Sequence, residues 1–292
     1  MTILVDLNQV MIANIMQQIG FSKKTNQGID ENLVRHMIIN SLRSYRQKFH
    51  KKYGELVICC DDKNYWRKDV FPYYKSHRKK DREESSFDWN AIFSVLNQVR
   101  EELKEYFPYK VIHVPRTEAD DIIATICSDA GKLNEYHEDH ERILILSTDK
   151  DFIQLQKYVN VDQYSPRDKK YIRSQKPHEY IREHIMRGDR GDGIPNFMSS
   201  DDTFVLGKRQ SRLSTKKIEE WIHKKPEDFC DEEMLRGYKR NESLIDFCQI
   251  PEWVHDSILE SYYNYKENDR SILMNYFIKK KMKNLMDSLQ EF

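Results

Sequence analysis

The chain of 292 residues carries 48 Lys and Arg against 48 Asp and Glu, which leaves a formal net charge of zero. This length suffices for one large or two ordinary domains, and the many aromatic residues exclude a disordered chain. No apolar run approaches the ~18 residues of a membrane span, and the N-terminal segment lacks the pattern of a signal peptide, so we expect no membrane association. Neutrality argues against a nucleic-acid partner only if the charges are evenly mixed.

Four short apolar runs, at residues 3–5, 56–60, 111–114 and 143–146, have the composition of strands buried on both faces. Between them, residues 31–50 and 88–107 carry apolar side chains at spacings of three and four, which predicts amphipathic helices. This alternation predicts an α/β fold with a mainly parallel central sheet flanked by helices. After about residue 176 the pattern is helical. We therefore expect an α/β domain at 1–176 and a smaller all-helical domain at 177–292.

The charges are not evenly mixed. Residues 63–82 contain eight basic residues against two acids, with five aromatic residues interleaved. A second basic run at 208–217 contains no acid, and a third lies at 279–283. Basic residues with aromatic neighbours suit a phosphate backbone and unstacked bases, although a solvated helix face would explain any single run.

Carboxylates are concentrated where this fold would place a site, because ligands of α/β sheets bind beyond the carboxyl ends of the strands. Three groups follow predicted strands, namely Asp6, then Asp61 and Asp62, then Asp149 and Asp151. A fourth group opens the helix after the 111–114 strand, and a fifth lies in a glycine-rich turn at 187–193. These groups are Glu118, Asp120 and Asp121, and Asp189 and Asp192.

Carboxylates brought this close would repel one another unless a cation lay among them. Oxygen ligands alone favour Mg²⁺ or Mn²⁺ over zinc, and such clusters hold two ions in enzymes that cleave phosphodiesters. Each acid singly also has a structural explanation, as a first-turn helix residue or a turn former. The coincidence of five groups at one sheet edge is what predicts a metal site.

Weaker candidates have simpler explanations. Residues 137–140 (His-Glu-Asp-His) suggest zinc, but they lack the helical spacing of a zinc motif and suit a solvated loop. Thr2, Ser147 and Thr148 have no histidine base nearby, so a nucleophilic triad has no support. The five cysteines show no metal-ligand spacing and are expected to be reduced.

The acidic groups in this order resemble the motifs of the 5′-nucleases, the family of flap endonucleases and of the 5′→3′ exonuclease domains of DNA polymerases. The likeness is carried by residues 118–121 (Glu-Ala-Asp-Asp), 147–152 and 188–192, with Asp6 and Asp61 at the family's strand ends. It is greatest to the ribonuclease H branch of T-even bacteriophages, through residues 65–69, 73–75, 82–85, 244–247 and 291–292.

The resemblance implies a 5′→3′ exonuclease and flap endonuclease that removes RNA primers and adjacent DNA during lagging-strand replication. It implies two Mg²⁺ ions, which Mn²⁺ can replace. The first would be held by Asp6, Asp61, Glu118, Asp120 and Asp149, with Asp121 in the same motif, and the second by Asp151, Asp189 and Asp192. Asp120 and Asp149 would be catalytic, together with Lys75 and Arg78, which match a basic pair at the scissile phosphate.

The resemblance also assigns the basic runs. Residues 62–88 would form a helical arch beside the site, with Tyr74 stacking on the terminal base. Nucleic acid would be bound by Arg67, Lys68, Tyr74, Lys75, Arg78 and Lys79 of the arch and by Lys208, Arg209, Arg212, Lys216 and Lys217 of the helical domain. The chain departs from the family pattern at Lys150, where glycine is usual, and at Gly193, where asparagine is usual.

The expected substrates are RNA–DNA hybrid, duplex and flap DNA, and the expected partners are a sliding clamp and a single-strand-binding protein. We expect a monomeric, phage-encoded protein in the host cytoplasm. The tail at 285–292 suits either a clamp-binding peptide or, preferably, a helix docked on its own domain. The alternative functions are an endoribonuclease of the related PIN type acting on single-stranded RNA, and a non-catalytic nucleic-acid-binding relative.

Overall fold

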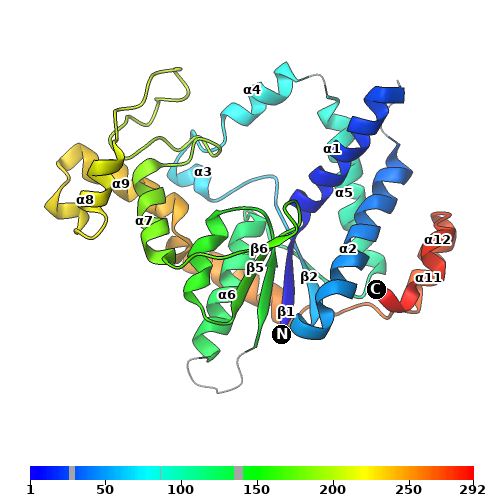
Figure 1. Cartoon of the computed structure of the whole chain (residues 1–292). Helices are drawn as coiled ribbons and strands as arrows, with labels where there is room; N and C mark the ends of the chain where they lie inside the picture. Colours follow the sequence, from blue (N-terminus) through cyan, green and yellow to red (C-terminus); the bar gives the residue numbers. More distant parts are fainter. Residues whose placement is uncertain (26–29, 86, 135–140) are drawn as a thin grey trace.

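A computed structural model describes residues 1–25, 30–85, 87–134 and 141–292 of the chain, so the segment 137–140 lies outside the described residues. Within the described residues a six-stranded sheet has the order β3-β2-β1-β4-β5-β6 (Figure 1). The parallel strands are β1 (Thr2–Asp6), β2 (Glu55–Cys60), β3 (Lys110–His113), β4 (Ile143–Leu146) and β5 (Val161–Ser165); β6 (Lys170–Ile172) is antiparallel. The predicted α/β fold is confirmed.

The register of the central strands explains why their carboxyl ends meet. Val5 of β1 lies opposite Ile58 of β2 and Leu146 of β4, and all three side chains are buried. Parallel strands end at one edge of the sheet, so the residues that follow these three strands are brought together. The four predicted strands are observed, while β5 and β6 were not predicted.

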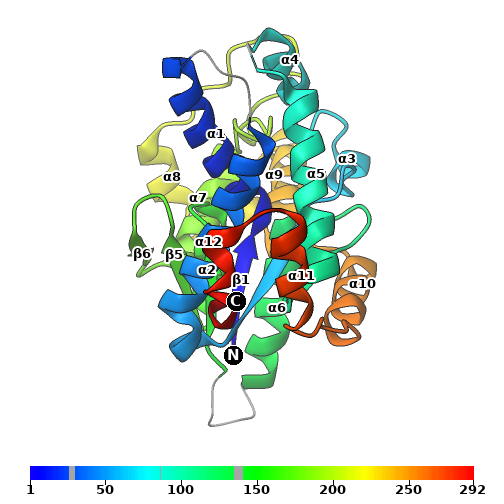
Figure 2. The ribbon, with the colours of Figure 1, turned by 90° about the vertical axis from the view of Figure 1, so that its right-hand side faces the viewer.

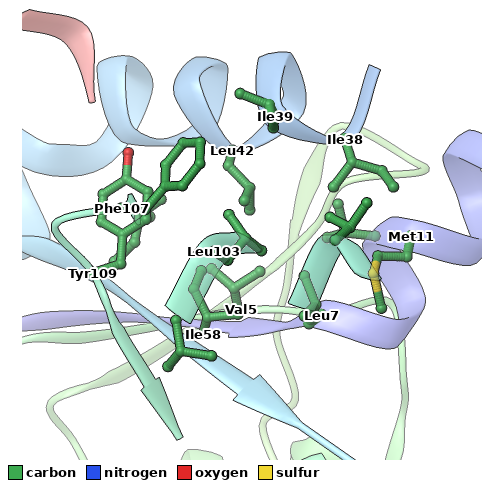
Figure 3. Close-up of a cluster of buried hydrophobic side chains, with 14 of the residues drawn as sticks. Val5, Leu7, Met11, Ile38, Ile39, Leu42, Ile58, Leu103, Phe107 and Tyr109 are labelled. Carbon is green, nitrogen blue, oxygen red and sulfur yellow. The ribbon is translucent and has the colours of Figure 1, made fainter. Parts of the chain in front are cut away.

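Helices cover both faces of the sheet. One face carries α1 (Leu7–Thr25), α2 (Glu31–Tyr53) and α5 (Trp89–Tyr106). Figure 3 shows part of the buried layer between the sheet and these helices, with Val5 and Ile58 of the strands below Leu42 and Leu103 of the helices. The other face carries α6 (Ala119–Asn134) and α10 (Glu252–Tyr263). None of the described helices is long and apolar enough to cross a membrane.

A third apolar cluster lies outside the two sheet faces. It joins α7 (Pro177–Arg187), α8 (Thr215–Trp221) and α9 (Glu232–Ile245) to Phe71 and Tyr74 of the segment that follows β2. That segment contains α3 (Arg67–Val70) and α4 (His77–Glu84), and Figure 1 shows it running from α7–α9 across to α5 above the sheet. The segment therefore spans the edge where β1, β2 and β4 end.

The C-terminal part of the chain returns to the α/β core, and the division of the chain at residue 176 stays a prediction. The helices α11 (Ile272–Lys279) and α12 (Lys283–Met286) lie over α2 and α5 (Figure 2). Phe292 is fully buried with its ring 5.8 Å from that of Phe107, and Glu291 pairs with Arg43 at 2.8 Å. The tail is thus docked on the protein, which is the interpretation that the sequence favoured. It packs against the helices that cover one face of the sheet. The helical part that stands apart from the sheet is confined to about 177–246.

Candidate metal centre

Acids at the ends of β1 and β2 are held in place by the residues that begin the next helices. Asp6 is the last residue of β1, and its Oδ1 accepts a hydrogen bond from the backbone of Gln9 at 3.0 Å. Asp61 Oδ1 accepts from the backbone of Ala119 at 2.6 Å, and its Oδ2 accepts from Asn8 Nδ2 at 2.5 Å. These bonds tie the start of α6, which carries Asp120, to the strand ends.

The loop after β4 brings a third acid to the same place. The hydroxyl of Ser147 lies 3.5 Å from Asp6 Oδ2 and accepts from the backbone of Asp149 at 3.1 Å. Gln9 holds this loop from the α1 side, because its amide donates to Ser147 Oγ at 3.1 Å and accepts from the backbone of Thr148 at 2.6 Å. The first-metal acids predicted from the sequence therefore converge.

The electrostatics show how unfavourable this convergence is without a cation. Burial, followed by the charge of Asp61, raises the pKa of Asp6 to about 7. Burial and then Asp151 raise the pKa of Asp149 to about 6. Asp120 has its pKa raised well above the usual range by burial and by the charges of Asp149 and Asp6. All three carboxylates face like charges and Asp6 is also buried, which is the arrangement that a bound cation would relieve.

A second group of ligands lies where α7 ends. Asp151 opens the 3₁₀ helix η1 (Asp151–Lys157), and Asp189 follows α7. Between them lies His184, whose Nε2 is 3.2 Å from Asp151 Oδ1 and 3.7 Å from Asp189 Oδ2. The ligand atoms of these three residues all lie within 4.8 Å of one another. His184 was not among the site residues predicted from the sequence, and its position makes it a candidate nitrogen ligand beside the predicted oxygen ligands.

The turn after α7 requires glycine at its first position. Gly188 has φ +67°, and a Cβ there would lie 2.4 Å from the carbonyl oxygens of Ile194 and Pro195. The turn places Asp189 so that its Oδ1 accepts from the backbones of Gly191 at 2.6 Å and Asp192 at 3.2 Å. Burial and the charge of Asp192 raise the pKa of Asp189. For His184, burial opposes the protonated ring, but Asp151 and Asp189 more than offset it and raise its pKa.

Two basic residues of the 62–88 segment reach into the acidic cluster. Lys75 Nζ lies 2.5 Å from Glu118 Oε1 and 3.4 Å from Asp192 Oδ2. Arg78 Nη2 lies 2.8 Å from Asp192 Oδ1. Burial opposes the charged form of Asp192, but Lys75 and Arg78 more than offset it and lower its pKa. The predicted basic pair and the predicted metal ligands are therefore in contact.

Arg67 and Asp121 form a buried ion pair. Arg67 is 3% exposed, and its guanidinium lies 3.0 Å from Glu118 Oε2 and 2.8 Å from Asp121 Oδ1. It also donates to the Leu244 carbonyl at 2.9 Å. Asp121 is fully buried and accepts from the Trp66 indole at 3.1 Å. These contacts give both residues a structural role, and their predicted contacts with nucleic acid and metal stay predictions.

Tyr74 is buried beside the acidic cluster. Its side chain is 3% exposed, and its predicted stacking on a base stays a prediction. Its hydroxyl lies 2.9 Å from Glu118 Oε2 and 2.8 Å from Asp192 Oδ2, which links the acids of α6 to those after α7. Tyr73 of the same segment is exposed, and Tyr65 is partly exposed.

The other basic residues predicted to bind nucleic acid lie on the surface. Lys68 and Lys79 are exposed on α3 and α4. In the 208–217 run, Lys208 and Arg209 line a hollow together with Arg190, which belongs to the turn of Asp189. Arg212, Lys216 and Lys217 are exposed farther along. Lys150 is exposed at the start of η1, and its effect on the second group stays a prediction.

Comparison with known proteins agrees with this architecture. Residues 1–184 match the model of the 5′-3′ exonuclease, N-terminal resolvase-like domain, and residues 177–292 match that of the T4 RNase H C-terminal domain. A ribonuclease H of Enterobacteria phage T4 is 33% identical over 299 residues, which cover 99% of this chain and 95% of the relative.

Solved structures of a phage T5 flap endonuclease are similar in fold. One, co-crystallised with metal ions, has a TM-score of 0.58 at 17% identity and covers 89% of this chain and 98% of its own. A second, a variant in a pseudo-enzyme–product complex with DNA and metal ions, has a TM-score of 0.60 at 16% identity and covers 90% and 99%. A third, with zinc bound, has a TM-score of 0.57 at 18% identity and covers 90% and 98%.

Proposed function

Because this chain belongs to the 5′→3′ exonuclease family that includes phage T4 ribonuclease H, we propose that it is a Mg²⁺-dependent 5′-nuclease with exonuclease and flap endonuclease activity. The observation that carries the proposal is the convergence of acids from five separate segments on one sheet edge, with two basic residues in contact with them. Structural ion pairs alone do not require carboxylates to repel one another in this way.

The donor set fits two divalent ions. The first would be held by Asp6, Asp61, Glu118, Asp120 and Asp149, and the second by Asp151, Asp189 and Asp192, with His184 beside them. The chemistry that such ions supply is activation of water and neutralisation of phosphate charge. Asp120 is affected by the charges of Asp6 and Asp149, and Asp149 by those of Asp151, Asp189 and Asp192. These two acids would therefore be the residues on which catalysis depends most.

The basic residues would hold the scissile phosphate. Lys75 and Arg78 face the acids from the 62–88 segment. A phosphate placed between these two residues and the proposed metal ions would therefore meet cations on both sides. Lys68 and Lys79 extend this surface along the segment, and the 208–217 run adds a second basic surface next to the turn of Asp189. Contacts of this kind bind the backbone without reading its sequence.

The proposed substrates are RNA–DNA hybrid, duplex DNA and flap DNA, and the proposed setting is removal of RNA primers with adjacent DNA in lagging-strand replication in the host cytoplasm. A sliding clamp and a single-strand-binding protein are proposed partners of a monomeric enzyme. The tail at 285–292 is a poor candidate for a clamp-binding peptide, because it is docked and Phe292 is buried in the core.

A direct assay uses a 5′-labelled RNA–DNA hybrid and a 5′-labelled flap substrate, each with and without Mg²⁺. Short 5′-terminal products that require Mg²⁺ are expected from both substrates. Internal cuts in single-stranded RNA without preference for a 5′ end would instead favour an endoribonuclease. A gel shift without products in either condition would favour a non-catalytic relative.

A further inference from the structure

His184 occupies a position in the acidic cluster that nothing in the motif pattern assigns. It lies in the last turn of α7 and approaches the carboxylates of Asp151 at 3.2 Å and Asp189 at 3.7 Å. Its Nε2 atom is buried and makes no hydrogen bond of good geometry within the described residues. The two carboxylates can pair with this nitrogen when the ring is protonated, and the neutral nitrogen can share a cation with them.

The separations match those of ligands that share one ion. Two donors that are each about 2.1 Å from an ion lie about 3.0 Å apart at a right angle and about 4.2 Å apart when opposed. The two distances from His184 Nε2, 3.2 and 3.7 Å, fall inside that window. Since the ligand atoms of all three residues lie within 4.8 Å of one another, the three residues are placed to coordinate a common ion with at most small side-chain adjustments.

The imidazole is held in this orientation by its surroundings. The Tyr180 ring stacks on it, with centroids 5.9 Å apart and an interplanar angle of 18°. The His184 carbonyl accepts from the backbone of Gly188 at 2.9 Å, which fixes the end of α7 relative to the turn of Asp189. Only 18% of the side chain is exposed. A ligand held this firmly is pre-organised for binding.

We propose that His184 is a nitrogen ligand of the second metal site, with Asp151 and Asp189, and that this site prefers Mn²⁺ to Mg²⁺ more strongly than the first site does. The proposal rests on the proposed function for the presence of metal and adds the identity and selectivity of one site. Mg²⁺ binds oxygen and retains its waters, whereas imidazole suits first-row transition ions. Among the described residues, the acids around Asp6 provide an all-oxygen site in the same molecule as an internal reference.

The test measures metal binding in the full chain without nucleic acid. Calorimetric titration should detect two Mn²⁺ sites, and pulsed electron paramagnetic resonance should show coupling of bound Mn²⁺ to an imidazole nitrogen. In His184→Gln the nitrogen coupling should disappear. One of the two Mn²⁺ affinities should fall by about 10- to 100-fold, with a smaller loss for Mg²⁺. His178→Gln, an exposed histidine on the same helix, is the matched control and should behave as the wild type.

The outcomes separate this inference from the proposed function. Two bound Mn²⁺ ions without nitrogen coupling in the wild-type protein would overturn the role of His184 while leaving the nuclease proposal standing. Absence of Mn²⁺ and Mg²⁺ binding altogether would contradict the nuclease proposal itself. Because the coupling is measured on the wild-type chain, the result does not depend on the folding of the variant. The variant assigns the signal to one of the chain's ten histidines.

Discussion

Lys75 Nζ lies 2.5 Å from Glu118 Oε1, so a lysine of the segment that crosses the sheet edge neutralises a carboxylate of the proposed first metal site. The same lysine has φ +54° and donates its backbone N–H to the Asp192 carbonyl at 2.8 Å. Its position is therefore fixed by the acidic turn as well as by the ion pair. A cation at the first site and Lys75 share one carboxylate partner.

Lys75→Ala should separate metal binding from cleavage. Cleavage of a flap substrate should fall by about 100-fold or more, because a cation facing the transferred phosphate is lost. Mg²⁺ affinity should stay the same or rise, because Glu118 and Asp192 lose a competing cation. Lys132→Ala, at the exposed end of α6 away from the acids, is the control and should change cleavage little. A fall in Mg²⁺ affinity in Lys75→Ala would contradict this account.

The raised pKa of Asp6 predicts how the stability of the metal-free protein depends on pH. The folded chain holds this proton up to about pH 7, whereas the unfolded chain releases it near 3.8. Between these values the folded state binds more protons, so the contribution of Asp6 to the free energy of unfolding falls as pH rises. The contribution is constant below about pH 4 and again above about pH 7.

Asp6→Asn removes this pH-dependent loss of stability, because the amide does not ionise. In EDTA its free energy of unfolding relative to wild type should increase between pH 4 and pH 7, by up to about 1.4 kcal/mol per pH unit, and then level off. Urea denaturation at several pH values provides the measurement, with Asp256→Asn on the exposed side of α10 as the control. A difference that is independent of pH would show that the Asp6 carboxylate is not strained in the metal-free protein.

Arg67 should matter for stability rather than for nucleic-acid contact. Arg67→Ala leaves Glu118 and Asp121 without their buried partner, so the free energy of unfolding should fall by about 3–5 kcal/mol. Lys68→Ala, at the next position and exposed, should change it by less than about 0.5 kcal/mol. The prediction fails if Arg67→Ala unfolds like wild type and loses only DNA affinity.

Gly188 and Gly207 form a matched pair for testing the turn after α7. Both have positive φ, at +67° and +64°, but a Cβ at Gly188 would meet two carbonyl oxygens at 2.4 Å while one at Gly207 would meet nothing within 4 Å. Gly207→Ala should therefore cost about 1 kcal/mol for the backbone conformation alone. Gly188→Ala should cost clearly more and also weaken metal binding at the Asp189 group. Equal losses for the two variants would show that the turn is not tightly constrained.

The strand ends were predictable because the signal is local. Ile3 to Val5 and Ile143 to Leu146 are continuous apolar runs, and Asp6 and Asp149 come at or shortly after their ends. The parallel register brings these ends together without any information on side-chain packing. β5 escaped prediction because it contains polar residues. Gln163 is buried there, and its amide donates to the carbonyls of Ser147 and Asp149. These carbonyl partners are far from Gln163 in the sequence, so they can be identified only from the folded sheet.

The direction of individual side chains could not be predicted from motifs. Asp120 and Asp121 are adjacent in one motif, yet Asp120 borders the acidic cluster and Asp121 turns inward to Arg67. Both residues lie in the first turn of α6, where consecutive side chains point about 100° apart around the helix axis. His184 is brought beside Asp189 by the end of α7 and the turn that follows it, and its position five residues before Asp189 matches none of the motifs considered in the sequence.

The central claim, metal-dependent cleavage by the converging carboxylates, is tested most directly with Asp149→Asn on a 5′-labelled flap substrate in Mg²⁺. Asp149 lies between both acidic groups, so the variant should lose cleavage while its affinity for the flap DNA remains within about threefold of wild type, a difference below about 0.7 kcal/mol. Asp256→Asn should cleave as the wild type does. Unchanged turnover in Asp149→Asn, or full wild-type activity in EDTA, would contradict the account.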